Sequence, residues 1–543
     1  SELLQSQLLA PINVSPVAPH LTETQLGIQP NAGPSGASFN QYDPLFARNQ
    51  ARLQVSALAG NNETYGDEVV YSQLLENSSL SLGQYHYETN GFRTNDDYQR
   101  DILNAFLQTN LTSNHSIQFE VKKNEQENGD IRLRFDSTDF TADRRETLEE
   151  TSYRLGYQNK ITSSSRFIAS VIQTDSLFTR NYTGEQEGPF LTDEDRKEES
   201  KSKTAELQYI SKRKNHDYIV GVGSYNYEND ASGTITITPP GPPVGSFSLD
   251  DDVDRSLING YIYSRWNTFN KLNITFGLSH NSIKDPTFDT KQFNPKFGLK
   301  WDLSSHTQLR FATFRTLKRP VKAEQTIEPT QVAGFNQFYD DPTAADAKNY
   351  GFALEHRMNN KFFTGVELSK RDLDVPYLDV NTMKRVFENQ TEFGHRAYIY
   401  WALNNATSLS VEYQYEEFDR ELSDNVVVNQ PIKLVTHKIP LSLKVNYPSG
   451  WSGSLTASYY DQDIIQPIDD ITFINYKDKF WMTDLNIGYR FAKRLGTINL
   501  EVRNLLDEEF MFYDAAFRSD ETSKPATLYH ERSIWLRLAL TFD

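Results

Sequence analysis

The last stretch of the chain, residues 531–543, reads ERSIWLRLALTFD. In an extended strand, one face of this stretch would carry only apolar side chains, namely Ile534, Leu536, Leu538, Leu540 and Phe542. The other face carries Arg537, which is costly against lipid and cheap against water. A strand of about 10 residues, tilted by roughly 45°, crosses the hydrocarbon core of a bilayer. The stretch therefore predicts a membrane-crossing β-strand between lipid and an aqueous interior.

The composition excludes several classes of protein. The 543 residues include no Cys, which excludes disulfides, thiolate metal sites and Cys nucleophiles together. The net charge of −18 argues against a nucleic-acid partner. No apolar run approaches the ~20 residues that a transmembrane helix needs. Hydropathy analysis misses a β-barrel because the apolar and polar residues of each strand alternate, so the mean hydropathy of the strand is moderate. The 29 Tyr and 33 Phe are consistent with the aromatic girdles of such a barrel at the two membrane interfaces.

The same alternation recurs from Ala51 to the end of the chain. Apolar residues of one parity oppose polar or charged residues of the other in segments that contain Phe119, Leu155, Leu207, Val411, Leu441 and Ile487. A soluble sandwich or propeller also repeats short strands. However, no repeat of roughly 40 residues is present, and the polar parity is too charged for a packed core. We therefore expect an all-β fold, a transmembrane antiparallel up-and-down β-barrel.

The connections between these segments are of two kinds. Short polar turns of the chemistry that forms tight hairpins lie near residues 76–78, 113–114, 163–164, 214–215, 270–271, 304–305, 359–360, 404–405, 448–450 and 493–494. Long polar loops are predicted at about 138–150, 180–202, 229–255, 318–346, 373–392, 419–434, 463–477 and 505–529. Short periplasmic turns and long extracellular loops are typical of outer-membrane barrels. Ten hairpins with one further strand at each end give about 22 strands.

Residues 1–50 differ from the rest of the chain. Six prolines, from Pro11 to Pro44, interrupt any helix or strand ladder, so this segment is interpreted as an extended leader. It is either a flexible arm or a partial occluder of the lumen, and residues 51–543 form the barrel. The chain begins at Ser1 without a signal peptide, so we expect a mature or truncated product whose export signal has been removed.

Three segments carry a resemblance to a known family. Residues 293–303, FNPKFGLKWDL, with Arg310, Arg315 and Arg319-Pro320, resemble the mid-barrel stretch of TonB-dependent receptors. Residues 437–451 are similar to a hairpin of that family that ends in Gly-Trp. Asn504-Leu505-Leu506-Asp507 is similar to the core of its penultimate strand. The resemblance implies a 22-stranded barrel in the outer membrane of a Gram-negative bacterium, and a role in transport.

The chain also departs from that family. Those receptors carry a globular plug and a short TonB-contacting box before the barrel, and residues 1–50 match neither. A barrel of ~22 strands encloses a wide lumen, because barrel diameter grows with strand number. We therefore expect something else to close it: long loops folded inward, the leader, a plug upstream of Ser1 or another chain.

Two groups of residues are candidate sites. Acidic residues gather in the predicted loops around 190 and 250, and Asp193, Asp195, Asp250, Asp251 and Asp252 are weak candidates for divalent cations, although a solvated acidic rim is the plainer interpretation. Arg310, Glu412, Arg490, Glu501, Arg503 and Arg537 are expected to face the lumen, together with Glu206. They either set the field of the pore or neutralise one another and keep the wall wet.

The remaining expectations concern function. The ten His residues are scattered without a Ser or Asp partner at informative spacing, so we expect no enzyme activity and no cofactor. The first hypothesis is a transporter or channel that receives or passes a substrate. The alternative is a plug-less barrel for export or anchoring, whose lumen holds a secreted polymer, protein or surface filament. Expected partners are outer-membrane lipid and lipopolysaccharide, a periplasmic or plug partner, and an extracellular ligand or filament.

Overall fold

A computed structural model describes residues 2–9, 12, 49–131, 138, 140–187, 190–239, 245–269, 271–286, 288–320, 326–339, 341–379, 384–421, 431–467, 472–513 and 528–542. The remaining residues, which include most of the leader and Asn270 of one predicted turn, lie outside the described residues.

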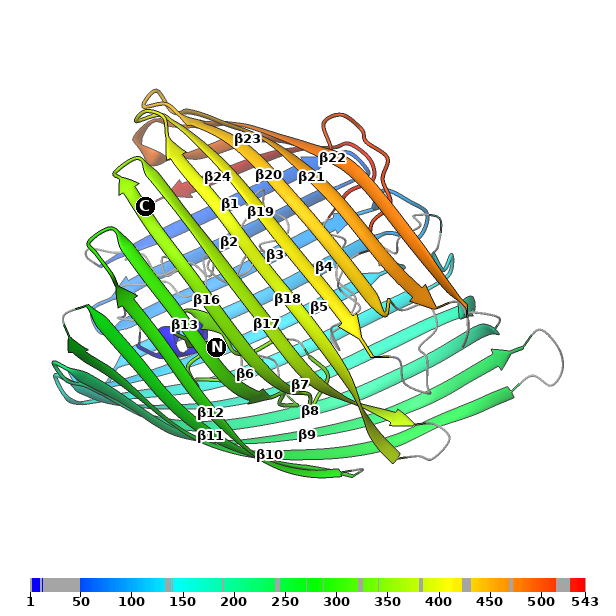
Figure 1. Ribbon diagram of the computed structural model, residues 1–543, viewed down its shortest axis with the longest axis horizontal. Coiled ribbons are helices and arrows are strands. Elements are labelled where there is room, and N and C mark those ends of the chain that lie inside the picture. The colour runs from blue at the N-terminus through cyan, green and yellow to red at the C-terminus, as the bar shows by residue number, and fades with distance from the viewer. Residues whose placement is uncertain are drawn as a thin grey trace.

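Twenty-two long strands form one sheet that closes on itself (Figure 1). The first half of the sheet consists of β1 (Gln50–Gly60), β2 (Tyr65–Leu75), β3 (Ser78–Thr89), β4 (Tyr98–Asn110), β5 (His115–Asn128), β6 (Arg145–Thr162), β7 (Ser165–Glu187), β8 (Phe190–Lys212), β9 (His216–Thr238), β10 (Gly245–Phe269) and β11 (Leu272–Asp285). The second half consists of β12 (Phe288–Asp302), β13 (Thr307–Leu317), β16 (Asp346–Asn359), β17 (Phe362–Asp379), β18 (Lys384–Ala402), β19 (Thr407–Arg420), β20 (Lys433–Asn446), β21 (Trp451–Pro467), β22 (Phe473–Arg490), β23 (Gly496–Arg503) and β24 (Ser533–Phe542).

Each of these 22 strands pairs antiparallel with the strands before and after it in this order, β13 with β16 included, and the two ends of the sheet meet. β24 pairs with β1, from Phe542 opposite Leu53 to Trp535 opposite Gly60. All ten predicted short turns join consecutive strands, so the expected barrel and strand number are confirmed. One of these turns, between β22 and β23, contains a 3-10 helix, η3 (Ala492–Arg494).

The wall of the barrel has two chemically different faces. In β6, Leu155 is 52% exposed on the outside, whereas its neighbour Arg154 is 6% exposed on the inside. In β24, Ile534, Leu536 and Phe542 are exposed on the outside, and Trp535 is buried on the inside. An apolar outer face and a polar inner face are what a strand between lipid and a lumen requires.

Several strands extend further than the sequence pattern predicted, so these loop predictions were wrong. Residues 180–202 and 229–255 were expected to be loops, but β7 continues to Glu187, β8 begins at Phe190, and β9 and β10 run from opposite sides to Thr238 and Gly245. The predicted loops near 138–150, 373–392, 419–434 and 463–477 are shortened in the same way. Beyond the lipid both faces are wet, so the apolar alternation stops while the backbone ladder continues.

The leader also contains a helix, where an extended segment was expected. α1 (Glu2–Leu9) ends just before Pro11, which cannot continue a helix with normal hydrogen bonding. Leu4 and Leu8 of α1 are buried against inward-facing side chains of β7 to β10, so the helix lies inside the barrel (Figure 1). Among the described residues, no helix is long and apolar enough to cross a membrane.

Candidate functional site

The connection between β13 and β16 folds into the lumen. We call residues 318–345 the inward loop, of which 321–325 and 340 lie outside the described residues. Its two short strands, β14 (Gln331–Val332) and β15 (Phe335–Asn336), form a hairpin around Ala333 and Gly334, with φ of 51° and 90°. Such positive φ values at both central residues suit a tight hairpin with Gly at the second position. Val332 and Phe335 pack on inward-facing side chains of β13 and β16.

An ion pair is buried where the inward loop meets β9 and β10. Arg319 donates to Glu328 Oε2, and both side chains are at most 5% exposed. The Tyr263 hydroxyl donates to Glu328 Oε1 at 2.5 Å, and Asn259 Nδ2 donates to Oε2 at 3.3 Å. The guanidinium also lies 4.8 Å from the Phe338 ring centre. A buried charge is tolerated only when it is paired and hydrogen-bonded, so each partner requires the other in place.

A second buried carboxylate, Glu206 of β8, holds the backbone of the same loop. Its Oε1 accepts hydrogen bonds from the Tyr225 hydroxyl at 2.6 Å and from Thr326 Oγ1 at 2.7 Å. Its Oε2 accepts the backbone N–H of Ile327 at 2.8 Å. Arg319 donates to both Tyr225 and Thr326, at 3.0 and 3.1 Å, which joins the two carboxylates into one network. The loop is therefore fixed to the wall by charge-assisted hydrogen bonds.

The inward loop is also anchored close to β16. Arg371 of β17 donates to Asp341 at 2.5 Å and to Glu392 at 2.6 Å. The same guanidinium lies 3.8 Å from the ring centre of Tyr339. The described parts of the loop are thus held by side chains of β8 to β10, β13, β16 and β17.

A second loop covers the inner wall on the other side of the barrel. We call residues 504–532, between β23 and β24, the stacked loop; residues 504–513 and 528–532 of it are described. Phe510 stacks on Phe480 of β22 at 4.4 Å between ring centres and on His530 at 4.1 Å, and Phe480 stacks on Tyr460 of β21 at 4.9 Å. The Gln462 side chain of β21 accepts from Tyr513 N at 2.7 Å and donates to Tyr513 O at 3.1 Å.

Asn504 and Asp507 close the base of the stacked loop. Asn504 Nδ2 donates to the carbonyls of Glu508 and Tyr529 at 2.9 and 3.1 Å, and Asp507 Oδ1 accepts the Arg532 N–H at 2.7 Å. Both residues have positive φ, a conformation that Asn and Asp tolerate better than most residues. The Asn504-Leu505-Leu506-Asp507 motif thus has a structural role, since it brings the two ends of the loop together.

These features can be compared with known proteins. The model of the family described as TonB dependent receptor-like, beta-barrel matches residues 75–505. The chain belongs to this family. Membership and the closed 22-stranded sheet together support outer-membrane transport as the class of function. The search of curated proteins finds no match.

Solved structures of receptors and transporters share the fold of this TonB-dependent receptor-like barrel. The siderophore receptor PiuA from Acinetobacter baumannii is 10% identical, with a TM-score of 0.69, over 92% of this chain and 83% of that one. The FrpB iron transporter from Neisseria meningitidis is 11% identical, with a TM-score of 0.67, over 91% and 82%. The copper transporter OprC is 13% identical, with a TM-score of 0.66, over 92% and 81%.

The six charges expected to face the lumen are placed as follows in this TonB-dependent receptor-like barrel. Arg310 contacts Glu355 and Glu367 at 3.0 and 2.8 Å. Glu412 pairs with Arg396 at 2.9 Å, and Glu501 with Arg537 at 3.5 Å. Arg503 lies over the rings of Tyr529 and Trp535. Arg490 is exposed at the end of β22. Four of these six side chains therefore form ion pairs on the inner wall.

The five acidic candidates lie on the extended strands. Asp193 and Asp195 belong to β8, and Asp250, Asp251 and Asp252 belong to β10. Asp193 accepts the Gly184 N–H at 2.7 Å, and the three β10 residues are exposed. Among the residues that the structure describes, no group of three His, Cys, Asp or Glu side chains is arranged to hold a metal ion.

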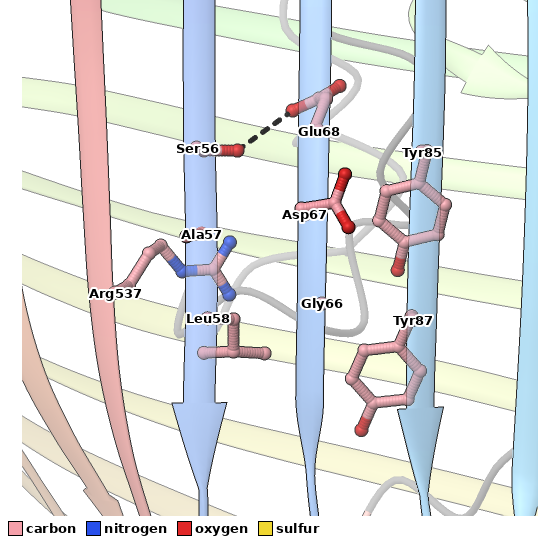
Figure 2. Close-up of a pocket in the computed structure, with 9 residues that line it drawn as sticks. All are labelled: Ser56, Ala57, Leu58, Gly66, Asp67, Glu68, Tyr85, Tyr87 and Arg537. Carbon is pink, nitrogen blue, oxygen red and sulfur yellow. Dashed lines mark hydrogen bonds between the residues drawn. The ribbon is translucent and has the colours of Figure 1, made fainter.

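A small cavity lies at the seam where β24 closes on β1. Ser56, Leu58, Glu68, Tyr85, Tyr87 and Arg537 are among the side chains around it, and Ser56 Oγ donates to Glu68 at 3.4 Å (Figure 2). Its volume of about 20 Å³ is room for one water molecule, so it is too small for a transported ligand.

Glu206 was expected to face the lumen, but Tyr225, which donates to it, was not identified from the sequence. Tyr225, Tyr261 and Tyr263 lie on the inward parity of their strands, where a wide lumen alone does not require large, buried side chains. Their size was the available signal that another segment covers this wall. The pairing of Arg319 with Glu328 lay inside a segment assigned to the extracellular surface, and no strand periodicity shows that a loop turns inward.

Proposed function

We propose that this barrel imports a small ligand across the outer membrane of a Gram-negative bacterium, and that the inward loop is its gate. One observation supports this most directly: the loop is held inside the barrel, against β8 to β10, by Arg319, Glu328 and Glu206, all of them buried. A loop that lay only at the rim of the barrel would keep its charged side chains in water, where they cost no desolvation energy. In this proposal, residues 51–543 are the transport unit and the leader is part of its closure.

The cargo is proposed by analogy with the similar structures, which are receptors or transporters of siderophores, iron and copper. A siderophore or metal ion that enters from the long-loop end would meet the inward loop before it reached the short-turn end. Passage therefore requires the loop to leave its seat on β8 to β10. No residue of this chain is proposed to make or break a covalent bond.

The gate is tested by single-channel conductance of the full chain in planar bilayers. We expect a closed or briefly flickering barrel, and a larger, longer-lived conductance in Arg319→Met, which leaves Glu328 without its cation. Arg145→Met is the matched control, because Arg145 of β6 is 48% exposed and pairs with Asp97 of the β3–β4 loop rather than with the inward loop. A large stable conductance of the unchanged chain would contradict the gate. It would favour the alternative, a barrel held open for a secreted polymer or filament.

Lipopolysaccharide is proposed as the lipid partner at the long-loop end of β13, β16 and β17. Arg315 and Lys348 lie directly opposite each other on the outer face, and Lys370 lies one row nearer the membrane, beside the exposed Tyr350. Arg315 pairs with Asp346, and Lys370 pairs with Asp372, which lies opposite Lys348, so carboxylates already offset much of the like-charge repulsion. A lipid phosphate would add charge-assisted hydrogen bonds to Lys348 and its two neighbouring cations.

The contact is tested by the amount of lipopolysaccharide that co-purifies with the protein. Lys348→Glu is expected to reduce the lipopolysaccharide retained after detergent washing, because it replaces the cation by a group that repels phosphate. Lys361→Glu, in the short turn between β16 and β17, is the control for a charge change at the other membrane surface. Equal retention in both variants would contradict a specific contact at Lys348.

A further inference from the structure

The N-terminal helix and the inward loop share one binding place on the barrel wall. Leu4 and Leu8 of α1 pack in the same apolar cluster as Ile327 of the loop. The wall contributes Ile168, Ile172, Ile210, Ile219, Tyr261 and Tyr263 to this cluster. Six large, mostly apolar side chains would be unfavourable toward an open aqueous lumen. Each of the two segments therefore helps to cover surface that the other leaves exposed.

One side chain is hydrogen-bonded to both segments. Gln208 of β8 is 1% exposed, and its Oε1 accepts from Gln5 Nε2 of α1 at 2.6 Å. Its Nε2 donates to the carbonyl of Ile327 at 2.7 Å and to the Tyr261 hydroxyl at 2.9 Å. Loss of either segment would leave part of this buried amide without a partner, which costs about 1–3 kcal/mol unless water replaces it.

The two segments meet at Gln208, near the short-turn end of β8. The inward loop connects the long-loop ends of β13 and β16. Gln208 lies four residues before β8 ends at Lys212, beside a short turn, so the loop reaches deep into the lumen. α1 lies at the same depth, against β6, where the absence of a side chain at Gly156 accommodates Leu8. A Cβ at position 156 would lie 2.3 Å from Leu8 Cδ2.

We infer that α1 is a latch on the inward loop: its seating at Gly156 and Gln208 stabilises the closed loop, and its displacement from this seat releases the loop. This inference rests on the proposed function of the loop as a gate. It gives the leader a regulatory role, because any protein or force that withdraws residues 2–9 from their seat weakens the loop's contacts at Ile327. Transmission needs no movement of the strands.

The latch is tested with a cysteine reporter, since the chain has no Cys of its own. Val332→Cys places a thiol at a fully buried position of the loop that belongs to a different apolar cluster from α1. A water-soluble maleimide labels it only when the loop undocks. Gly156→Val in this background fills the seat of Leu8 without touching the loop. We expect labelling to accelerate by about tenfold or more, which corresponds to ~1.4 kcal/mol.

Gly260→Val is the matched control, because a Cβ at Gly260 of β10 meets nothing within 4 Å. Gln208→Leu is a second route to the same release and removes the hydrogen bonds to Gln5, Ile327 and Tyr261 at once. In the double variant with Gly156→Val, the free-energy change is expected to be smaller than the sum of the two single changes, because both substitutions disturb the same α1 binding site. The mobility of unheated samples on gels confirms that each variant has a folded barrel.

The outcomes separate the latch from the gate. Equal labelling rates in Gly156→Val and Gly260→Val would overturn the latch. If Arg319→Met still accelerated labelling and raised conductance in that case, the gate would stand alone. If neither Gly156→Val nor Arg319→Met changed labelling, the loop would not be a moving part and the proposed function would fail with the latch.

Discussion

The inward loop and the stacked loop cover opposite parts of the inner wall with different chemistry. The inward loop is held by a buried ion pair and a buried carboxylate, centred on Arg319, Glu328 and Glu206. The stacked loop is held by parallel rings, centred on Phe480 and Phe510, and by amide contacts from Asn504. Both loops lie against the inner wall, but the free energy that holds each of them in place responds differently to the loss of a single side chain.

This difference predicts different modes of opening. A buried charge that loses its partner is strongly destabilising, so the inward loop is expected to be either fully docked or released. A stack of rings loses contact area one ring at a time, and each pair adds only ~0.5–1.5 kcal/mol beyond its burial. The stacked loop is therefore expected to loosen gradually. The first behaviour suits a gate, and the second suits a lid that adapts its shape.

The largest effect is expected from Glu328→Met, which leaves Arg319 buried without its anion. Removal of one partner of a buried pair costs about 3–5 kcal/mol. Hydrogen exchange of amides 326–339 should therefore accelerate by about a hundredfold or more, limited by full release of the loop. Glu199→Met is the control, because Glu199 is 61% exposed and pairs with Lys197 at the surface.

The double variant Arg319→Met/Glu328→Met sharpens the same comparison. Replacing both members of a buried pair by apolar groups is often nearly neutral. We expect slower exchange in the double variant than in Glu328→Met alone. Exchange at least as fast in the double variant would mean that the two charges do not act as a pair, and the all-or-none description of the inward loop would be wrong.

A smaller effect is expected from Phe480→Leu, which keeps an apolar side chain and removes one of the two inner rings of the stack. The loss should be about 1–2 kcal/mol. Exchange of amides 505–513 should rise by roughly tenfold, while amides 326–339 stay unchanged. Phe473→Leu, on the same strand and 40% exposed, is the control. Faster exchange in both loops would show that the two covers form one cooperative unit.

The fold and this pair of loops were not equally accessible from the sequence. The alternation of residues such as Leu155 and Arg154 identifies strands because lipid and water impose a period of two. Asn- and Ser-rich turns then fix the strand number. The loops lack that constraint, so β7 to β10 proved longer than expected, and the inward turn of 318–345 left no periodic signal. The pairing of Arg319 with Glu328 depends on how the loop folds in three dimensions, so it could not be predicted from the sequence pattern.

The smallest predicted effect concerns pH and the contact between the stacked loop and the β3–β4 loop. Phe92 lies 5.7 Å from the His530 ring and 5.8 Å from the Tyr529 ring. Burial, with a smaller contribution from Arg93, lowers the pKa of His530 to about 4. Burial also raises the pKa of Asp96 to about 7, although Arg93, at 3.7 Å, opposes the increase. The two groups therefore respond to pH in opposite directions.

The signs follow from which protonation state each folded site prefers. The packed site prefers neutral His530, so its stabilising contribution is present above pH 6.5 and is lost as the pH falls through 4. It prefers protonated Asp96, so that contribution is present below pH 3.8 and is lost as the pH rises through 7. In the unchanged chain the two trends oppose each other between pH 4 and 7, and the protection of amides 92–97 and 528–532 should vary little.

Single substitutions separate the two trends. His530→Phe keeps an aromatic ring on Phe510, and protection should then fall as the pH rises from 4 to 7 because only Asp96 titrates. Asp96→Asn should give the reverse, with protection rising over the same interval because only His530 titrates. Hydrogen exchange corrected for the intrinsic pH dependence of the amide measures both. If protection changed with pH in the same direction in both variants, the pKa shifts assigned to His530 and Asp96 would be wrong. Each variant keeps only one of the two titrating groups, so its pH dependence should have the sign of that group.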